Sequence, residues 1–180
     1  MVLPKRKHTR LKEYDYSNNG YYFVTICTQD KLPILSKITV GRGFTPAVIK
    51  LTKIGKTVQT QLLDLQNRFT NIIIEKYVIM PTHIHFIILI SDYETNTKQT
   101  ASLLTAGVNP RPTLTDIICV FKSMSTRICN QYDNVIGRKI WQSSFYEHVI
   151  RNKDDYENIW QYIEDNPKKW EEDRYYCNIL

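Results

Sequence analysis

The stretch that decides the fold is Asn71–Ser91, NIIIEKYVIMPTHIHFIILIS, in which two apolar runs flank the short connection Met80-Pro81-Thr82. The first run, Asn71–Ile79, is rich in β-branched residues, and the second, His83–Ile90, is apolar on both faces if it is extended. Both runs have the length of a strand and are too short to cross a bilayer. The pattern predicts two neighbouring strands, of which the second is central and rigid.

Outward from this pair, the sequence predicts further strands and helices. The strands are Tyr21–Thr28 and a short segment at about 143–150. The helices are expected near residues 46–67 with a start at Thr45-Pro46, after the capping pair Thr113 and Asp116, and over Asp154–Asp165 with an end at Pro167. The order β, α, β, β, α, β, α predicts an α+β fold with a ferredoxin-like antiparallel sheet and helices packed mainly on one face.

The length of 180 residues and the hydrophobic share of 42% suit one domain over residues 1–180. A basic arm is expected at about 1–15. An irregular loop is expected at about 91–112, where its length indicates either a functional or a disordered segment. No apolar run is long enough for a membrane span, and Met1–Lys12 lacks the features of a secretory signal. A cytoplasmic location follows as the expectation.

The four cysteines also bear on the class of protein. They are Cys27, Cys119, Cys129 and Cys177, and none forms a C-x-x-C pair. This spacing argues against a zinc ribbon and a disulfide framework. Buried, reduced thiols are the expected state.

The net charge of +6 is concentrated near the start of the chain, in Lys5, Arg6, Lys7, Arg10 and Lys12. A basic surface binds polyanions, and nucleic acid is the commonest partner for a protein of this size. A solvated tail that aids solubility is the alternative. The charge alone leaves these two interpretations equally open.

Two of the four histidines, His83 and His85, lie two residues apart on the predicted central strand. Their side chains therefore project from the same face, while Ile84 points to the opposite layer. Two neutral imidazoles in this arrangement can hold one divalent ion. The alternative is a pair of polar side chains at a strand end, each satisfied by a hydrogen bond.

The last predicted helix offers a second candidate feature. Its apolar stripe is expected to dock on the sheet and consists of Tyr156, Ile159, Trp160 and Ile163. Tyr162 and Asn166 lie one turn apart on the flank of this stripe, where an amide oxygen can add a ligand to a hard divalent ion. Because the chain has twelve tyrosines, spacing alone does not single out Tyr162.

Four stretches of the chain resemble the REP-associated tyrosine transposases, which are HUH-type single-strand DNA transposases. They are RLKEYDYS (10–17) with YFVTICT (22–28), MPTHIH (80–85), LTDI (114–117) with FKS (121–123), and WQ (141–142) through YEHVIRN (146–152) to Tyr162-Ile163 and Asn166-Pro167. Together they span nearly the whole chain in the order of that family.

The resemblance implies a metal-dependent enzyme that cuts and rejoins single-stranded DNA at REP-type hairpins through a covalent phosphotyrosine. It implies Mg²⁺ or Mn²⁺ at the pair His83 and His85, Tyr162 as the nucleophile, and Asn166 as the third metal ligand. His148 and Arg151 are expected near the site or the DNA, or as caps of the segment before the last helix. The implied partner is a REP-like DNA hairpin, bound by a monomer or homodimer that is nucleoid-associated when bound to DNA.

Further contacts with DNA are predicted less directly. Candidates for phosphate contacts are Lys5, Arg6, Arg10, Lys12, Lys122 and Arg127. Tyr14, Tyr16, Tyr21 and Tyr22 are candidates for stacking on unpaired bases, with core packing as the alternative for each. Tyr156 is the nearest rival to Tyr162, but a tryptophan occupies the position four residues later, and Tyr146 is a weaker candidate.

Other functions stay open at this stage. One is a catalytically quiet protein that binds REP or other single-stranded DNA hairpins, against which the joint presence of His83, His85 and Tyr162 argues. Another is an RNA-binding domain on a similar sheet, with exposed aromatic rings that stack on bases. A hydrolytic metalloenzyme for small molecules has little support, because no acidic residue lies near the histidine pair in its segment.

Overall fold

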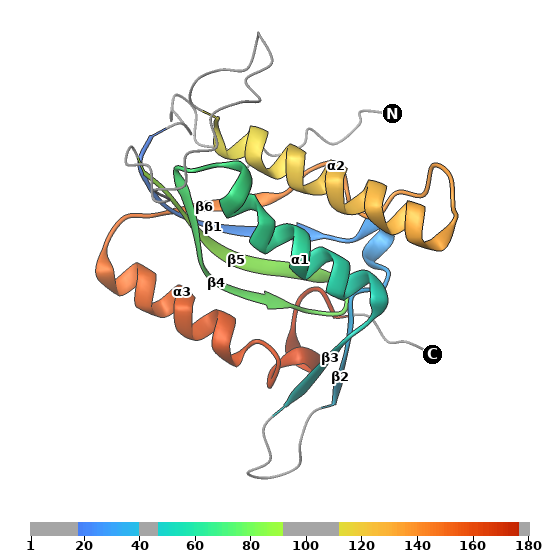
Figure 1. The fold of residues 1–180 in the computed structure, drawn as a ribbon. Coiled ribbons are helices and arrows are strands. Elements are labelled where there is room, and N and C mark those ends of the chain that lie inside the picture. The colour runs from blue at the N-terminus through green and yellow to red at the C-terminus, as the bar shows by residue number, and fades with distance from the viewer. Residues whose placement is uncertain (1–17, 40–46, 92–111, 177–180) are drawn as a thin grey trace, which may run out of the picture.

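The computed structural model describes residues 18–39, 47–91 and 112–176, and Figure 1 shows their arrangement. The strands are β1 (Gly20–Cys27), β2 (Ser36–Thr39), β3 (Val48–Leu51), β4 (Ile72–Ile79), β5 (His83–Ile90) and β6 (Tyr146–Ile150). The helices are α1 (Lys53–Arg68), α2 (Leu114–Asp133) and α3 (Lys153–Asp165), with the 3-10 helices η1 (Gln29–Lys31) and η2 (Trp170–Glu172). The predicted basic arm, the predicted helix start at Thr45-Pro46 and nearly all of the predicted irregular loop lie outside the described residues.

Four strands form one antiparallel sheet in the order β4-β5-β1-β6. Along the chain these strands and the first two helices follow the order β1, α1, β4, β5, α2, β6. That connectivity and strand order define a ferredoxin-like α+β fold, as predicted. The prediction that β5 is a central strand is also confirmed, because it lies between β4 and β1.

The helices cover both faces of the sheet. Figure 1 shows α1 and α2 on one face and α3 on the other. On the first face α1 and α2 pack over a core that includes Tyr22, Ile84 and Phe86. On the second face the predicted stripe of α3 packs in a smaller cluster with Phe23 and Ile87. The prediction of helices mainly on one face therefore holds for α1 and α2, while α3 docks opposite them.

The alternation along β5 positions the histidine pair. Ile84 and Phe86 face the core under α1 and α2, whereas Ile87 belongs to the cluster under α3. His83 and His85 share the face of Ile87, because side chains two residues apart point the same way. The strand is buried along nearly its whole length, so it is a rigid support for both rings.

The helix predicted at 46–67 is wrong at its start. Residues 48–51 form β3, which pairs with β2 from Ser36↔Leu51 to Thr39↔Val48. The helix begins only after Thr52, whose side chain accepts a hydrogen bond from the Gly55 N–H at 3.0 Å. Val48 and Leu51 fit helical spacing, but a β-branched segment also suits a strand, and the pairing with β2 decides between them.

Gly55 lies where α1 approaches the backbone of Leu35. A Cβ atom at Gly55 would lie 1.9 Å from the Leu35 carbonyl oxygen, which also accepts the Thr52 N–H at 2.9 Å. We expect Gly55→Ala to lower the free energy of unfolding by about 2–3 kcal/mol, because backbone must move to relieve the overlap. Urea denaturation measures the effect, and Lys56→Ala on the exposed side of α1 is the control, with an expected change within about 0.5 kcal/mol. Equal stability of the two variants would contradict the close approach.

The other element boundaries agree closely with the sequence pattern. Thr113 and Asp116 form a complete capping box at the start of α2, and α3 begins after Asn152, whose side chain accepts the Asp155 N–H. The predicted effect of Pro167 on the preceding residue is wrong, because Asn166 keeps helical dihedrals (φ −53°, ψ −42°). Its N–H donates to Tyr162 O at 3.0 Å, and burial of its side chain outweighs the usual preference before proline.

Two expectations from composition concern the state of the cysteines and the absence of a membrane-spanning segment. Cys27, Cys119 and Cys129 are free thiols, while Cys177 lies outside the described residues. The expectation of buried thiols is wrong for Cys119, which is exposed on α2. Within the described ranges, no helix has both the length and the apolar character that a membrane span requires.

Candidate active site

His83 and His85 form the centre of the candidate site. Their ring centroids lie 4.4 Å apart, and both side chains are fully buried. Burial lowers the pKa of His83 well below its ordinary value, and the neighbouring His85 lowers it further. Burial, assisted by Arg174, lowers the pKa of His85 to about 3. Both imidazoles are therefore neutral at physiological pH, which is the state that binds a metal ion.

Two threonine hydroxyls orient the rings. Thr25 Oγ1 lies 2.8 Å from His85 Nδ1, and Thr82 Oγ1 lies 3.1 Å from His83 Nδ1. Thr82 also donates its hydroxyl hydrogen to the Tyr175 carbonyl at 3.0 Å, so it accepts from His83 and the Nδ1 of that ring carries the hydrogen. The lone pair of His83 is then on Nε2, which is buried and has no hydrogen-bond partner among the described residues.

Tyr162 reaches the histidine pair from α3. Its hydroxyl lies 3.4 Å from His85 Nε2, and its ring packs edge-on against Phe23 at a centroid distance of 6.0 Å. The side chain is 42% exposed, so the site is open to solvent on this side. Burial raises the pKa of Tyr162, Asp173 raises it further, and Arg174 and a hydrogen bond with Asn166 lower it. The net shift is upward, so the hydroxyl is protonated at neutral pH.

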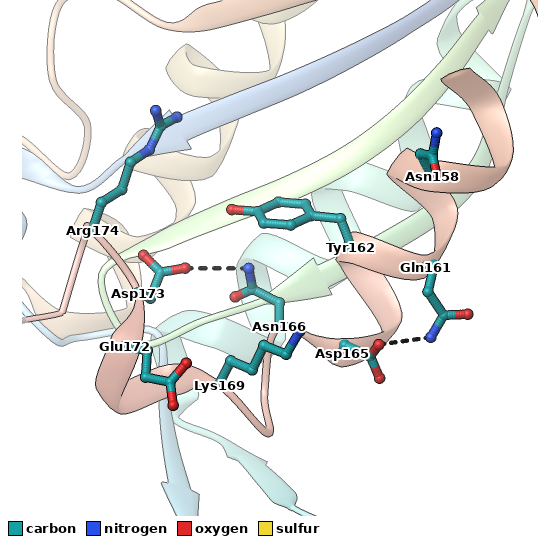
Figure 2. A pocket seen from close by; sticks show the side chains of 9 residues that line it. All are labelled: Asn158, Gln161, Tyr162, Asp165, Asn166, Lys169, Glu172, Asp173 and Arg174. Carbon is teal, nitrogen blue, oxygen red and sulfur yellow. Dashed lines mark hydrogen bonds between the residues drawn. The ribbon is translucent and has the colours of Figure 1, made fainter. Parts of the chain in front are cut away.

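Asn166 lies one helical turn after Tyr162 and is buried. Its amide nitrogen donates to Asp173 Oδ2 at 3.2 Å, as Figure 2 shows. Its amide oxygen is buried without a hydrogen-bond partner in the part of the chain that the structure describes. Asn166 thus fixes Asp173 and retains one unpaired amide oxygen, an acceptor that can also ligate a metal ion, beside Tyr162.

Asp173 is the functional candidate that the sequence analysis missed. One ligand atom each from His83, His85 and Asp173 lie within 4.8 Å of one another. The chain returns to the site after α3 through η2, where the buried ring of Trp170 packs in the cluster under α3. No spacing rule links Asp173 to the histidines, so the sequence pattern held no direct signal for it.

The segment after η2 borders the site. The Tyr175 ring lies 4.6 Å from the His83 ring, and burial raises the pKa of Tyr175 to about 12. The Arg174 guanidinium lies over the Tyr175 ring at 4.6 Å and over the Tyr146 ring at 5.7 Å. In Figure 2 the Tyr162 hydroxyl points from α3 toward Asp173 and Arg174. A cavity of about 480 Å³ opens beside this hydroxyl, between the outer side of α3 and η2.

Some of the predicted site residues lie together in the structure, and others do not. His83, His85, Tyr162 and Asn166 converge, as described above. His148 instead pairs with Asp155, with its Nε2 2.9 Å from Asp155 Oδ2, and the Arg151 N–H donates to the same carboxylate oxygen at 3.3 Å. These contacts match the capping alternative at the start of α3, and a role of either residue at the DNA stays a prediction.

The rival tyrosines lie outside the histidine cluster. Tyr156 packs edge-on against Tyr21, and its hydroxyl lies 3.4 Å from Glu75 Oε2. Tyr146 is partly exposed, 6.4 Å from the Phe23 ring. Stacking of Tyr22 on a base is ruled out, because that side chain is fully buried in the core. Tyr14 and Tyr16 lie outside the described residues.

The predicted phosphate-binding cations also differ in their surroundings. The Lys122 ammonium donates to the carbonyls of Gln142 and Ser143 at 2.5 and 3.0 Å, and burial lowers its pKa. Arg127 is exposed on α2. The remaining candidates, Lys5, Arg6, Arg10 and Lys12, lie outside the described residues.

The residues of the site fit a divalent metal ion. His83 Nε2 and Asn166 Oδ1 are buried atoms without partners among the described residues, and such atoms are costly unless a ligand satisfies them. Asp173 adds a carboxylate within reach of both neutral rings. A set of imidazole nitrogens with carboxylate and amide oxygens suits Mn²⁺ and comparable divalent ions.

Comparison with solved structures defines the class of fold. A solved structure of a REP-associated tyrosine transposase bound to a REP hairpin has a TM-score of 0.57 to this chain at 20% sequence identity. The similarity covers 89% of this chain and 73% of that chain. The protein therefore has the fold of that tyrosine transposase.

Comparison with known sequences shows the family. No family model matches the sequence. An uncharacterized protein from Haemophilus influenzae is 30% identical over 177 residues, which cover 96% of this chain and 94% of that protein. The chain belongs to the same protein family as this Haemophilus influenzae protein.

Proposed function

We propose that this protein is a metal-dependent, single-stranded DNA transposase or endonuclease that cuts and rejoins DNA at REP-type hairpins through Tyr162. The observation that carries the proposal is the 3.4 Å contact between the Tyr162 hydroxyl and His85 Nε2. It brings the predicted nucleophile from α3 to the predicted metal-binding pair on β5. The solved structure with this fold is a tyrosine transposase bound to a REP hairpin, which supports the same class of substrate.

His83, His85 and Asp173 would hold the metal ion, with the oxygen of Asn166 as a further ligand. A bound Mg²⁺ or Mn²⁺ supplies positive charge that polarises the scissile phosphate and offsets charge in the transition state. Two neutral rings and one carboxylate contribute a single negative charge, which leaves a divalent site with net positive charge toward the DNA. This charge balance suits a phosphodiester substrate.

Tyr162 performs the covalent step. Its oxygen attacks the phosphorus atom and forms a new P–O bond, while the bond from phosphorus to the 3′ oxygen breaks. The products are a 5′ phosphotyrosine and a free 3′ hydroxyl, which takes up a proton as Tyr162 loses one. Arg174 and Asn166 assist, because both lower the pKa of Tyr162 and so favour the charge that develops on its oxygen.

The reverse step rejoins DNA. The phosphotyrosine retains the energy of the original phosphodiester, so no external energy source is required. A 3′ hydroxyl attacks the phosphorus atom, the bond to Tyr162 breaks, and the tyrosine hydroxyl is restored. When that 3′ hydroxyl belongs to another strand, the outcome is strand transfer.

A labelled hairpin oligonucleotide with single-stranded flanks tests the proposal. We expect incubation with the protein and Mn²⁺ to give a covalent adduct that survives a denaturing gel, and EDTA to prevent it. Retarded mobility in a native gel without any adduct would overturn the enzymatic proposal and favour the hairpin-binding alternative.

The contribution of Asp173 to metal binding can be measured separately. We expect Asp173→Ala to raise the Kd for Mn²⁺ by about tenfold or more, because the site loses its carboxylate and Asn166 loses its partner. Isothermal titration with Mn²⁺ gives the affinity. Glu172→Ala removes an exposed acid of the same charge at the adjacent position and is the matched control, with an unchanged Kd. Equal affinities of the two variants would exclude Asp173 as a ligand.

A further inference from the structure

The surface formed by the C-terminal half of α2 and the segment 134–143, here called the α2–β6 surface, carries two adjoining hollows. Their volumes are about 380 and 350 Å³, and Arg127 lines both. The first hollow is also lined by Lys122, Arg138 and Lys139. Among the described residues that line the two hollows, none is acidic. The α2–β6 surface is therefore suited to a polyanion.

Two of these four cations hold the surface together. Lys122 donates to the carbonyls of Gln142 and Ser143, as described above. Arg138 donates to Asp133 Oδ2 at 2.7 Å and to Asn130 Oδ1 at 3.1 Å. These bonds fix the segment 138–143 against α2, so the residues of this segment that line the hollows are held in place.

The other two cations face outward. Arg127 and Lys139 are both exposed, and the described part of the chain provides neither with an ion pair. The Arg127 guanidinium donates a hydrogen bond to the neutral Met124 Sδ at 3.4 Å, which does not offset its positive charge. Asp133, the acid close to this surface, is already neutralised by Arg138 and Lys53. The charges of Arg127 and Lys139 are thus available to an external anion.

The α2–β6 surface lies at the same end of the sheet as the candidate active site. The Gln142 N–H donates to Cys27 O at 3.0 Å, and the Gln29 N–H donates to Ile140 O at 2.7 Å. Cys27 is the β1 residue opposite His83 on β5. The segment that carries Lys139 is therefore attached to the strand beside the histidine pair, and neighbouring strands lie only about 5 Å apart.

The residues that line the hollows indicate whether this surface suits duplex or single-stranded DNA. An unpaired strand is bound by exposed aromatic rings on which its bases stack. The only aromatic ring that lines either hollow, among the described residues, is Trp141, which is buried with its Nε1–H donated to Ser125. Tyr162 at the candidate active site is exposed, as is Tyr146 on β6. Tyr132 on α2 is exposed too, but its ring lies beside Lys53 and lines neither hollow. Cations and hydroxyls without rings are typical of contacts to a phosphate backbone.

We propose that the α2–β6 surface binds the phosphate backbone of the duplex stem of a DNA hairpin, with Arg127 and Lys139 as the contacting cations. The proposal rests on the proposed function for its choice of substrate. A stem bound there leaves its single-stranded flank at the end of the sheet where Tyr162 and the histidine pair lie. The surface thus recognises the stem, and the active site receives the strand to be cut.

Fluorescence anisotropy of the full chain in EDTA tests the proposal, with a labelled hairpin and an unstructured single strand of equal length as probes. The test variant is Arg127→Glu with Lys139→Glu. The matched control is Lys37→Glu with Lys56→Glu, which makes the same charge change at exposed positions on β2 and α1. We expect the test variant to bind the hairpin about tenfold or more weakly than the control variant, with equal affinities for the single strand. Arg127→Ala with Lys139→Ala should reduce the salt slope of hairpin binding by about 2.

Equal hairpin affinities of the test and control variants would overturn the proposal. If charge reversal unfolds the chain, as judged by circular dichroism, the salt slope of the double alanine variant decides, and an unchanged slope contradicts the proposal. Failure of the proposed function gives a different result. In that case the wild-type protein forms no adduct with Mn²⁺, yet hairpin binding still depends on Arg127 and Lys139.

Discussion

Tyr162→Phe will abolish the covalent protein–DNA adduct and leave the fold and the hairpin affinity intact. The substitution removes only the hydroxyl, while the ring keeps its contacts with Phe23 and His85. We expect the rate of adduct formation to fall by roughly three orders of magnitude or more, because the other hydroxyls beside the histidine pair are engaged. Those of Thr25 and Thr82 contact the rings, and that of Tyr175, whose pKa burial raises to about 12, accepts a hydrogen bond from Arg174. A denaturing gel with the labelled hairpin and Mn²⁺ measures the rate.

Two other tyrosines serve as matched controls. Tyr156→Phe removes a hydroxyl from the same helix, next to Glu75, and Tyr146→Phe removes one from β6. Both variants should form the adduct at near the wild-type rate. Loss of the adduct in Tyr156→Phe, together with its persistence in Tyr162→Phe, would show that Tyr156 and not Tyr162 is the nucleophile.

His83→Ala will remove both the response to metal and DNA cleavage. Binding of Mn²⁺ to the folded protein should stabilise the wild-type chain by about 2.7 kcal/mol when the ion is at a hundredfold excess over Kd. Without the Nε2 of His83, that stabilisation should be lost, and cleavage should disappear with it. Thermal denaturation with and without Mn²⁺ measures the first effect, and the denaturing gel measures the second.

The same variant separates the metal site from DNA binding. In EDTA, His83→Ala should bind the hairpin within about threefold of the wild-type protein, because phosphate contacts supply most of the affinity. His148→Ala is the control, since His148 pairs with Asp155 and not with the residues of the metal site. This variant should keep the thermal stabilisation by Mn²⁺. Normal cutting by His83→Ala would show that the metal assignment is wrong. An RNA-binding domain would instead bind RNA regardless of EDTA and of substitutions at His83 and His85.

Local patterns predicted the parts of the structure that local chemistry determines. Alternation alone placed His83 and His85 on one face of a buried strand. The capping box at Thr113 and the stripe of α3 were readable because their periods and hydrogen bonds are internal to one element. The choice of Tyr162 among twelve tyrosines required the family resemblance. What sets Tyr162 apart is the contact of its hydroxyl with His85, which no local sequence pattern reveals.

Tertiary contacts determined the features that the sequence did not predict. Residues 48–51 satisfy helical spacing, and only the pairing with β2 makes them a strand. Asp173 follows α3 in an irregular segment, and it reaches the histidines because Trp170 is buried under α3 and Asn166 holds the carboxylate. Neither contact follows a fixed spacing in the chain, so periodicity could not have found them.

The most direct test of the central claim is to identify the residue that becomes linked to DNA. The hairpin adduct is formed with Mn²⁺, digested with nuclease and protease, and mapped by tandem mass spectrometry. The proposed mechanism predicts a nucleotide attached through its 5′ phosphate to Tyr162, and no such peptide when EDTA replaces the metal. A nucleotide on Tyr146 or Tyr156, or a Tyr162 linkage that forms equally well in EDTA, would contradict it.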